Sequence, residues 1–325
     1  MKFVRRALPY VSFFLVLAAS FVFWQKHDVL LDWVAARGYQ PASEVKSLVS
    51  GTTMTSYAKQ LFYANLPAIE DKKQFNQHCT DPSEQVAVLG CFTGNRLGIY
   101  LYDVTDERLA GIEHVTAAHE MLHQAYQRLN KKEKTRVGGL LQEYHDLKAS
   151  QKLRDKIASY KDSEPEQLQN EMHSIFGTEA ADLPAELEEY YSQYFADRKQ
   201  VLALYQKYQA EFDKRIAQIE TYDERLTELK NQIEANKHEL ESREKQLSTQ
   251  RNQLDAYLAA NRIAEYNAAV PGFNAAVISY RKLVDDTNAM VEEFNRLLGE
   301  RNELAVQERQ LEAAIDSSVD TAPKQ

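Results

Sequence analysis

Two histidines separated by three residues form the short pattern in this chain that carries reaction chemistry. His119, Glu120 and His123 stand in the order H-E-x-x-H. On a helix, residues four apart share a face, so His119 and His123 can ligate one metal ion while Glu120 reaches a water molecule bound to it. The remaining residues of the stretch 116–125 are uncharged, as expected for a helix buried behind a metal. The spacing therefore predicts one bound metal ion per chain, with Glu120 beside its water molecule.

These residues resemble the zinc helix of the zinc metallopeptidases. The metzincin branch adds a glycine and a third histidine within the next six residues, and residues 124–129 contain neither. The gluzincin branch takes a glutamate from a later helix, written N-E-x-x-S-D in its thermolysin-like members. Residues 170–174 match the first five positions, but Ile175 stands in place of the aspartate. The resemblance implies Glu171 as the third zinc ligand and leaves the partner that orients the histidines unidentified.

The predicted surroundings of Glu171 agree with a ligand role. It lies at the edge of an apolar helix face, where a carboxylate without a partner is costly. That face consists of Leu168, Met172, Ile175 and Phe176. If Glu171 is not the ligand, Glu164 and Glu179 are the alternatives.

The chemistry implied is hydrolysis of a peptide bond in a peptide or protein substrate. Zinc (Zn2+) held by His119, His123 and Glu171 keeps its fourth position for water and lowers the pKa of that water toward about 7. Glu120 takes the proton and later delivers it to the leaving amine. The oxyanion of the tetrahedral intermediate needs a further donor. His173, Tyr190 and Tyr191 are the candidates for this role, with Tyr126 and His145 less favoured.

The elements around the pattern are predicted from composition and spacing. Branched and aromatic residues predict a strand over 96–104, and helical apolar spacing predicts a helix over 106–129. A capping pattern at Ser163 predicts a helix that ends at Gly177. The resemblance covers residues 86–197 and implies a zincin-like domain in which an extended substrate pairs with the strand.

The N-terminus predicts an extracytoplasmic protein. Residues 7–24 are 18 residues without a charge, preceded by a basic head, and at about 1.5 Å per residue they cover roughly 27 Å. The positive-inside rule predicts a membrane anchor with a cytoplasmic N-terminus and the catalytic domain outside the cytoplasm. A cleaved signal peptide, giving a secreted protein, is the alternative. Cys79 and Cys91 are expected to form a disulfide there, with two buried thiols as the alternative.

A heptad pattern begins after residue 197. Its first arm has an unbroken apolar series at Tyr205, Phe212, Ile219, Leu226, Ile233, Leu240, Leu247 and Leu254. A second arm is aligned on Val270, Val277, Val284, Val291 and Leu298, accompanied by Tyr266, Phe273, Tyr280 and Phe294. A ladder formed by Asn267, Asn274, Asn288, Asn295 and Asn302 is either a recognition stripe or a polar flank that fixes the register.

The two arms predict a long coiled coil. An antiparallel hairpin turning at 259–262 is favoured over one long helix that pairs with another chain. Pro271 should kink the second arm or mark the turn. The coiled coil is expected to engage a protein partner or substrate, or to self-associate.

The predicted fold class is mainly α with a small β-sheet. The expected domains are a cytoplasmic head and transmembrane helix (1–26), the compact α+β metallopeptidase-like domain (27–197), the hairpin (198–316) and a disordered tail (317–325). With 39 basic and 48 acidic side chains the formal net charge is −9, which excludes an electrostatically driven nucleic-acid binder. The alternative function is a structural or scaffolding coiled-coil protein whose zinc site is inert, and a cell-wall peptide or amide is an alternative substrate.

Overall fold

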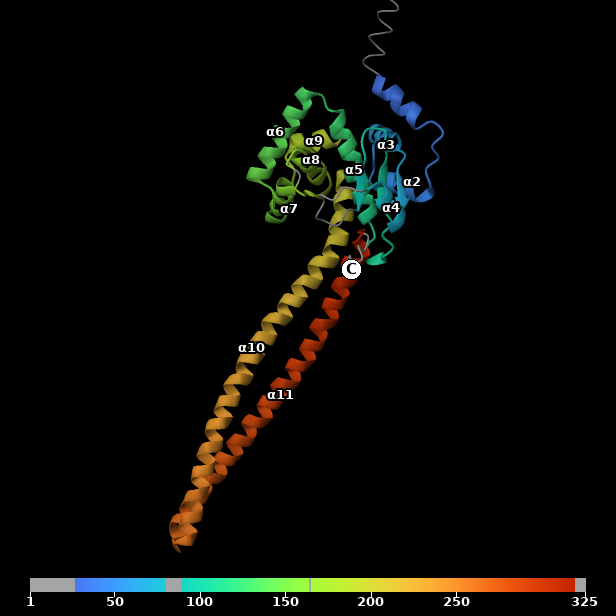
Figure 1. Cartoon of the computed structure of the whole chain (residues 1–325). Coiled ribbons are helices and arrows are strands. Elements are labelled where there is room, and N and C mark those ends of the chain that lie inside the picture. Colours follow the sequence, from blue (N-terminus) through green and yellow to red (C-terminus); the bar gives the residue numbers. More distant parts are fainter. Residues whose placement is uncertain (1–26, 80–88, 164, 319–325) are drawn as a thin grey trace, which may run out of the picture. The chain divides into compact units, whose positions relative to one another are not determined.

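The computed structural model describes residues 27–79, 89–163 and 165–318, and it is mostly helical with one small sheet (Figure 1). The chain forms two compact units, residues 1–211 with 312–325 and residues 212–311. Their boundary therefore lies inside a helix, 14 residues beyond the predicted one. In the described ranges no helix is both long enough and apolar enough to cross a membrane, and the run 7–24 lies outside them.

The first unit contains short helices and three strands. Residues 27–35 are helical and precede the labelled elements. The helices are α2 (Ser43–Gly51), α3 (Ser56–Tyr63), α4 (Lys72–His78), α5 (Ile112–Arg128), α6 (Lys131–Leu147), α7 (Gln151–Ser163), α8 (Leu168–Glu179) and α9 (Ala185–Tyr191). The strands are β1 (Ala68–Glu70), β2 (Gly90–Phe92) and β3 (Ile99–Tyr102), and a 3-10 turn, η1, covers Glu107–Leu109.

The sheet has the order β1-β3-β2, with β1 parallel and β2 antiparallel to β3. The predicted strand over 96–104 is confirmed at its centre as β3. However, β3 is the middle strand, paired with β1 on one side and β2 on the other. The expectation that an extended substrate adds to this strand is therefore wrong, because its backbone offers no free edge. The edges of the described sheet are β1 and β2.

The α5 helix is the centre of the first unit. It begins at Ile112 rather than at 106, because η1 precedes it and Gly111 adopts a left-handed φ of 107° that interrupts the helix. Its apolar face packs within the main core, with α8 directly against it.

The α8 helix differs from its prediction at both ends. Ser163 belongs to α7, and α8 begins at Leu168 with Gln167 as its N-cap. Gly177 does not end the helix, which continues to Glu179. A Cβ atom at Gly177 would lie 2.4 Å from Cδ1 of Leu122 and 2.8 Å from Cε1 of Tyr191. This glycine therefore allows the close approach of α8 to α5.

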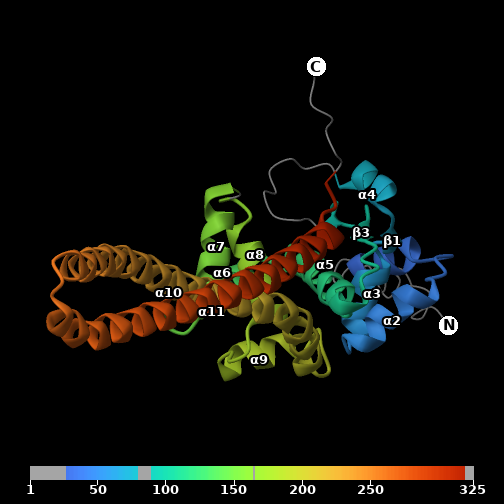
Figure 2. The same cartoon turned by 90° about the horizontal axis from the view of Figure 1, so that it is seen from below.

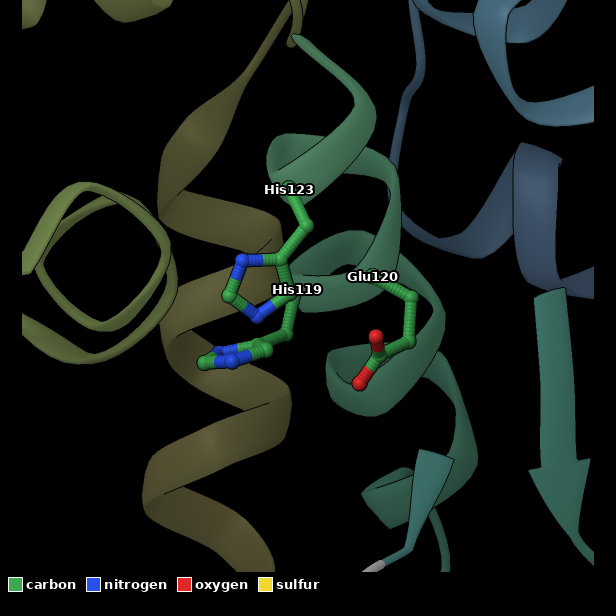
Figure 3. Close-up of side chains that lie close together, drawn as sticks. All are labelled: His119, Glu120 and His123. Atoms are coloured by element: carbon green, nitrogen blue, oxygen red, sulfur yellow. The ribbon is translucent and has the colours of Figure 1, made fainter. Parts of the chain in front are cut away.

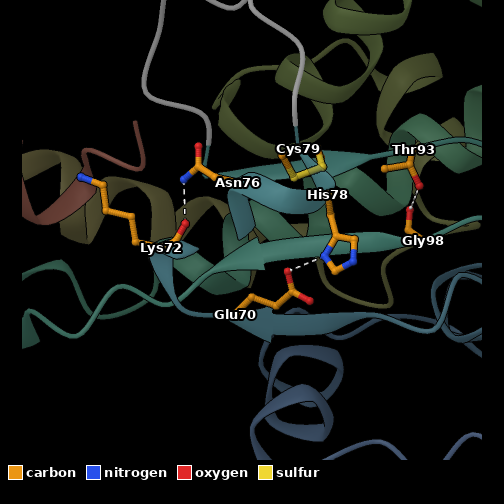
Figure 4. The surroundings of a disulfide bond; sticks show 8 residues. Glu70, Lys72, Asn76, His78, Cys79, Thr93 and Gly98 are labelled. Carbon is orange, nitrogen blue, oxygen red and sulfur yellow. Dashed lines mark hydrogen bonds and ion pairs between the residues drawn. A yellow bond between two sulfur atoms is a disulfide. The ribbon is translucent and has the colours of Figure 1, made fainter. Parts of the chain in front are cut away.

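A disulfide joins Cys79, at the end of α4, to Cys91 in β2, which excludes the two-thiol alternative (Figure 4). Nearby, the backbone carbonyl of Ser317 accepts a hydrogen bond of 2.5 Å from Nδ2 of Asn76. Ser317 is buried. The predicted disordered tail is therefore wrong at its first residue, and residues 319–325 lie outside the described part.

The second unit, residues 212–311, is an antiparallel hairpin built from most of α10 (Arg198–Ala259) and most of α11 (Ile263–Ile315) (Figures 1 and 2). As the residue numbers of the contacting residues increase along α10, those of their partners on α11 decrease. The pairs are Tyr222 with Glu300, Arg225 with Glu293, Asn236 with Thr287 and Arg243 with Ser279. The predicted fold-back is confirmed, and Pro271 lies inside α11 rather than at the turn. Asn261, with φ of 56°, occupies the turn.

The predicted heptad register is confirmed in the first arm. In the second arm it is wrong at Val291 and Leu298, whereas the other predicted positions are partly buried. Every predicted apolar seam position of α10 is at least partly buried. In α11 the seam contains Met290 and Leu297, which pack in one cluster with Leu226 and Leu229. Val291 and Leu298 are each 38% exposed, whereas Leu297 is 7% exposed. The five asparagines of the ladder are also exposed.

Candidate metal centre

Helix α5 carries three chemically active side chains on adjoining turns. His119, Glu120 and His123 each offer a ligand atom, and these atoms lie within 4.8 Å of one another (Figure 3). The rings of His119 and His123 are 4.6 Å apart between centroids, arranged edge to face. Glu120 and His123 are buried, and His119 is partly buried. The four-residue spacing of the histidines on one buried helix thus brings His119, Glu120 and His123 together, as predicted from the sequence.

Helix α8 adds a carboxylate to this group. The Oε2 atom of Glu171 lies 3.6 Å from Nε2 of His119, and its Oε1 atom lies 3.5 Å from Nε2 of His123. Zinc bonds of roughly 2.0–2.1 Å in a tetrahedron separate neighbouring ligand atoms by about 3.4 Å. Glu171 therefore lies at a distance from both imidazoles that suits a third zinc ligand.

The protonation states of these groups also suit a metal. Burial alone would raise the pKa of Glu171, but the charge on His123 and the hydrogen bond from His119 outweigh it and hold that pKa below its usual range. Burial lowers the pKa of His123, and Glu171 offsets this only in part. At neutral pH the site thus holds an ionised carboxylate and a neutral His123 imidazole, as metal ligation requires.

Ser174 contacts the His123 ring and is a candidate for the orienting partner that sequence reasoning left unidentified. Its Oγ atom lies 3.2 Å from Nδ1 of His123, and the residue is fully buried. Ile175, where the family pattern has an aspartate, lies in the apolar core instead. The serine of N-E-x-x-S was visible in the sequence, but its target was not, because the contact depends on how α8 packs on α5.

The candidates for oxyanion stabilisation form a buried network. Nε2 of His173 lies 2.8 Å from the Tyr190 hydroxyl, which lies 3.2 Å from that of Tyr194. The Tyr191 hydroxyl donates to the backbone carbonyl of His173 at 2.7 Å. Burial and the neighbouring His123 and His119 lower the pKa of His173 to about 3, so its ring is neutral. Tyr194 is a member that sequence reasoning missed, although it lies one helical turn after Tyr190.

These contacts separate the candidates. Tyr191 has already committed its single hydroxyl proton to the main chain, whereas His173 and Tyr190 share one hydrogen bond whose direction depends on the tautomer. The Tyr126 ring lies 5.3 Å from that of His173, and its hydroxyl contacts Gln169. His145 pairs instead with its neighbour Asp146 at 2.8 Å.

Of the alternative third ligands, the described one, Glu179, pairs with a lysine instead of the histidines. Glu179 is buried and forms an ion pair with Nζ of Lys156 at 2.5 Å. Glu164 lies outside the described residues. Of the two glutamates that the structure describes, Glu171 is thus the one that lies against both imidazoles.

The edge strand β2 lies directly on the metal helix. A Cβ atom at Gly90 would be 2.6 Å from Cγ2 of Thr116 and 2.9 Å from Oε1 of Glu120. Only glycine allows the strand to approach the carboxylate so closely. Sequence reasoning missed this strand, since three residues beside a disulfide carry little periodicity.

No family model matches the chain, and no match to it is found among the curated proteins or the solved structures. The inference of function therefore depends on the site itself.

Proposed function

We propose that this chain is a membrane-anchored, extracytoplasmic zinc metallopeptidase. The observation that carries the proposal is the position of Glu120 beside His119, His123 and Glu171. A site that only stabilises a fold needs ligands and no base. Here the buried Glu120 carboxylate accompanies two histidines and the nearby Glu171, which as three ligands would leave one zinc position for water. The resemblance to the gluzincins supports the same assignment.

Bound zinc would lower the pKa of a water molecule and polarise the substrate carbonyl. Glu120 would accept the proton of that water and pass it to the leaving amine. His173 or Tyr190 would donate a hydrogen bond to the developing oxyanion, after a change from the mutual contact that they make in this structure. Ser174 would hold the His123 ring in place.

The substrate would bind as an extended strand along β2 rather than β3. In the part of the sheet that the structure describes, β2 is an edge strand beside the Glu120 carboxylate. An edge strand presents unpaired backbone groups that an extended peptide can pair with. The Cys79–Cys91 disulfide holds this strand to α4 and suits an oxidising compartment.

The anchor and the hairpin complete the proposal. The uncharged run 7–24 would span the membrane, leaving the metal centre outside the cytoplasm. The hairpin, which forms a compact unit of its own, would engage a substrate or a protein partner. The competing function is that of a scaffolding protein, in which the hairpin is the working part and the zinc site is inert.

The decisive experiment compares the full-length wild type with Glu120→Gln in detergent or nanodiscs. We expect both to bind one zinc per chain, and the variant to lose cleavage of an unstructured protein substrate by about 10²–10⁴-fold. Glu113→Gln, on the same helix, is the matched control. Stoichiometric zinc without any cleavage that depends on Glu120 would favour the scaffolding function. Glu171→Ala should lose zinc, and wild-type affinity in this variant would reject the proposed ligand.

A further inference from the structure

The helix at residues 27–35 has its polar and apolar faces reversed. Asp28 and Asp32 both contact Arg96 on the inner side of the helix, and Asp32 is only 3% exposed. The outer face instead carries large apolar side chains, each 44–61% exposed: Val29, Leu30, Leu31, Trp33 and Val34. A helix on the surface of a water-soluble domain normally shows the opposite arrangement. The reversal indicates that the medium outside this helix is not water.

Two arginines fix the helix in this orientation. Asp32 accepts hydrogen bonds from Nε of Arg96 at 2.8 Å and from Nη2 of Arg128 at 2.5 Å. Asp28 pairs with the same two arginines at 2.8 and 2.5 Å. Rotation of the helix to bury its apolar side would break all four contacts. We call these four residues the arginine clamp.

The clamp connects the helix to the metal centre. Arg128 is the last residue of α5, the helix that carries His119 and His123, and Arg96 lies shortly before β3. The position of residues 27–35 is therefore linked to the position of α5 through the ion pairs of Arg128 with Asp28 and Asp32. Arg37 lies over the Trp33 ring at 5.4 Å, so a basic group accompanies the exposed aromatic.

The sequence before the helix identifies the occupant of its apolar face. The uncharged run ends at Trp24, three residues before His27. At no more than about 3.6 Å per residue, the helix begins within roughly 11 Å of the end of that run. If the run spans the bilayer, the helix must start at the membrane surface, where tryptophan and amphipathic helices prefer to lie.

We propose that residues 27–35 lie in the membrane–water interface with Trp33 and its apolar neighbours in the lipid, while the arginine clamp holds the metal helix to this contact. The inference rests on the membrane anchoring in the proposed function. The occupant is a phospholipid surface, and a protein partner or a second copy of this chain is an alternative that the test separates.

The chain contains two tryptophans, Trp24 and Trp33, so Trp24→Phe makes Trp33 a unique fluorescent probe in the full-length protein. The variant is reconstituted into phosphatidylcholine vesicles, with and without bromine on the acyl chains near the headgroup. Flotation and alkaline extraction first establish that the chain is anchored. We expect bromolipid to quench Trp33 emission at least twofold and the vesicle to protect it from aqueous acrylamide.

The control probe is Leu147→Trp in a chain that also carries Trp24→Phe and Trp33→Phe. Leu147 is 69% exposed at the end of α6, so this tryptophan should be quenched by acrylamide and little by bromolipid. A chain that does not float with the vesicles overturns the anchoring and, with it, this inference. An anchored chain whose Trp33 is quenched by acrylamide and not by bromolipid overturns the inference alone. Protection from both quenchers identifies a protein occupant and also overturns it.

Discussion

Ser174 on α8 and His123 on α5 face each other, with Oγ and Nδ1 3.2 Å apart. The other ring nitrogen of His123 faces Glu171, which lies three residues before Ser174 on the same helix. A proton on Nδ1, donated to the serine, leaves the Nε2 lone pair for a metal. One helix therefore supplies both the candidate acidic ligand and a hydroxyl that can hold the His123 ring in place.

Ser174→Ala should weaken zinc binding by about 10–100-fold, because the His123 ring loses the partner that orients it. The measurement is a zinc titration in competition with a chelator of known affinity. Thr178→Ser, one turn further along α8, is the matched control, since the Thr178 hydroxyl donates to carbonyls of its own helix. Equal affinities in wild type and Ser174→Ala would show that the serine does not position the ring.

Gly177→Ala should destabilise the first unit by about 1–3 kcal/mol. The new Cβ would overlap Leu122 and Tyr191, which forces α8 away from α5 and weakens zinc binding as well. Urea unfolding and the same zinc titration measure the two effects. Gly139→Ala on α6 has open space around its Cβ and should stabilise the helix slightly, by up to about 1 kcal/mol. Similar results for both alanines would reject the role of Gly177 in helix contact.

Short-range patterns predicted much of the fold and part of the site. The metal helix follows from local spacing, since His119 and His123 need only one helical turn to meet. The disulfide and the folding back of the hairpin were also predicted correctly. The errors concern contacts between elements. Without the position of α5, the sequence at Gly177 predicts the end of a helix. Without the two neighbouring strands, the sequence of β3 gives no sign that both of its edges are already paired.

The register error at Val291 and Leu298 of α11 has a related cause. Met290 and Val291 are adjacent and both apolar, as are Leu297 and Leu298. Either member of each pair continues a heptad, so periodicity alone permits two registers one residue apart. Packing against Leu226 and Leu229 selects the first member of each pair.

This register predicts different effects of truncating two adjacent leucines. Leu297→Ala should destabilise the hairpin by about 2 kcal/mol or more, because Leu297 is buried in the seam. Leu298→Ala should cost less than about 1 kcal/mol, since its side chain is 38% exposed. Thermal unfolding followed by circular dichroism in the full-length chain measures both. A larger loss in Leu298→Ala would restore the register predicted from sequence.

The arginine clamp predicts that replacing Asp32 destabilises the first unit more than replacing Asp28 does. Asp32→Ala should lower the free energy of unfolding of the first unit by about 3–5 kcal/mol, because it leaves the guanidinium groups of Arg96 and Arg128 poorly compensated in a largely buried site. Asp28 bonds to the same arginines, but its side chain is 46% exposed, and Asp28→Ala should cost no more than about 1 kcal/mol. Urea unfolding in low and high salt measures the difference, and salt should reduce only the smaller effect. Equal losses in the two variants would mean that the clamp acts as an exposed ion-pair network, which could not hold the apolar face outward.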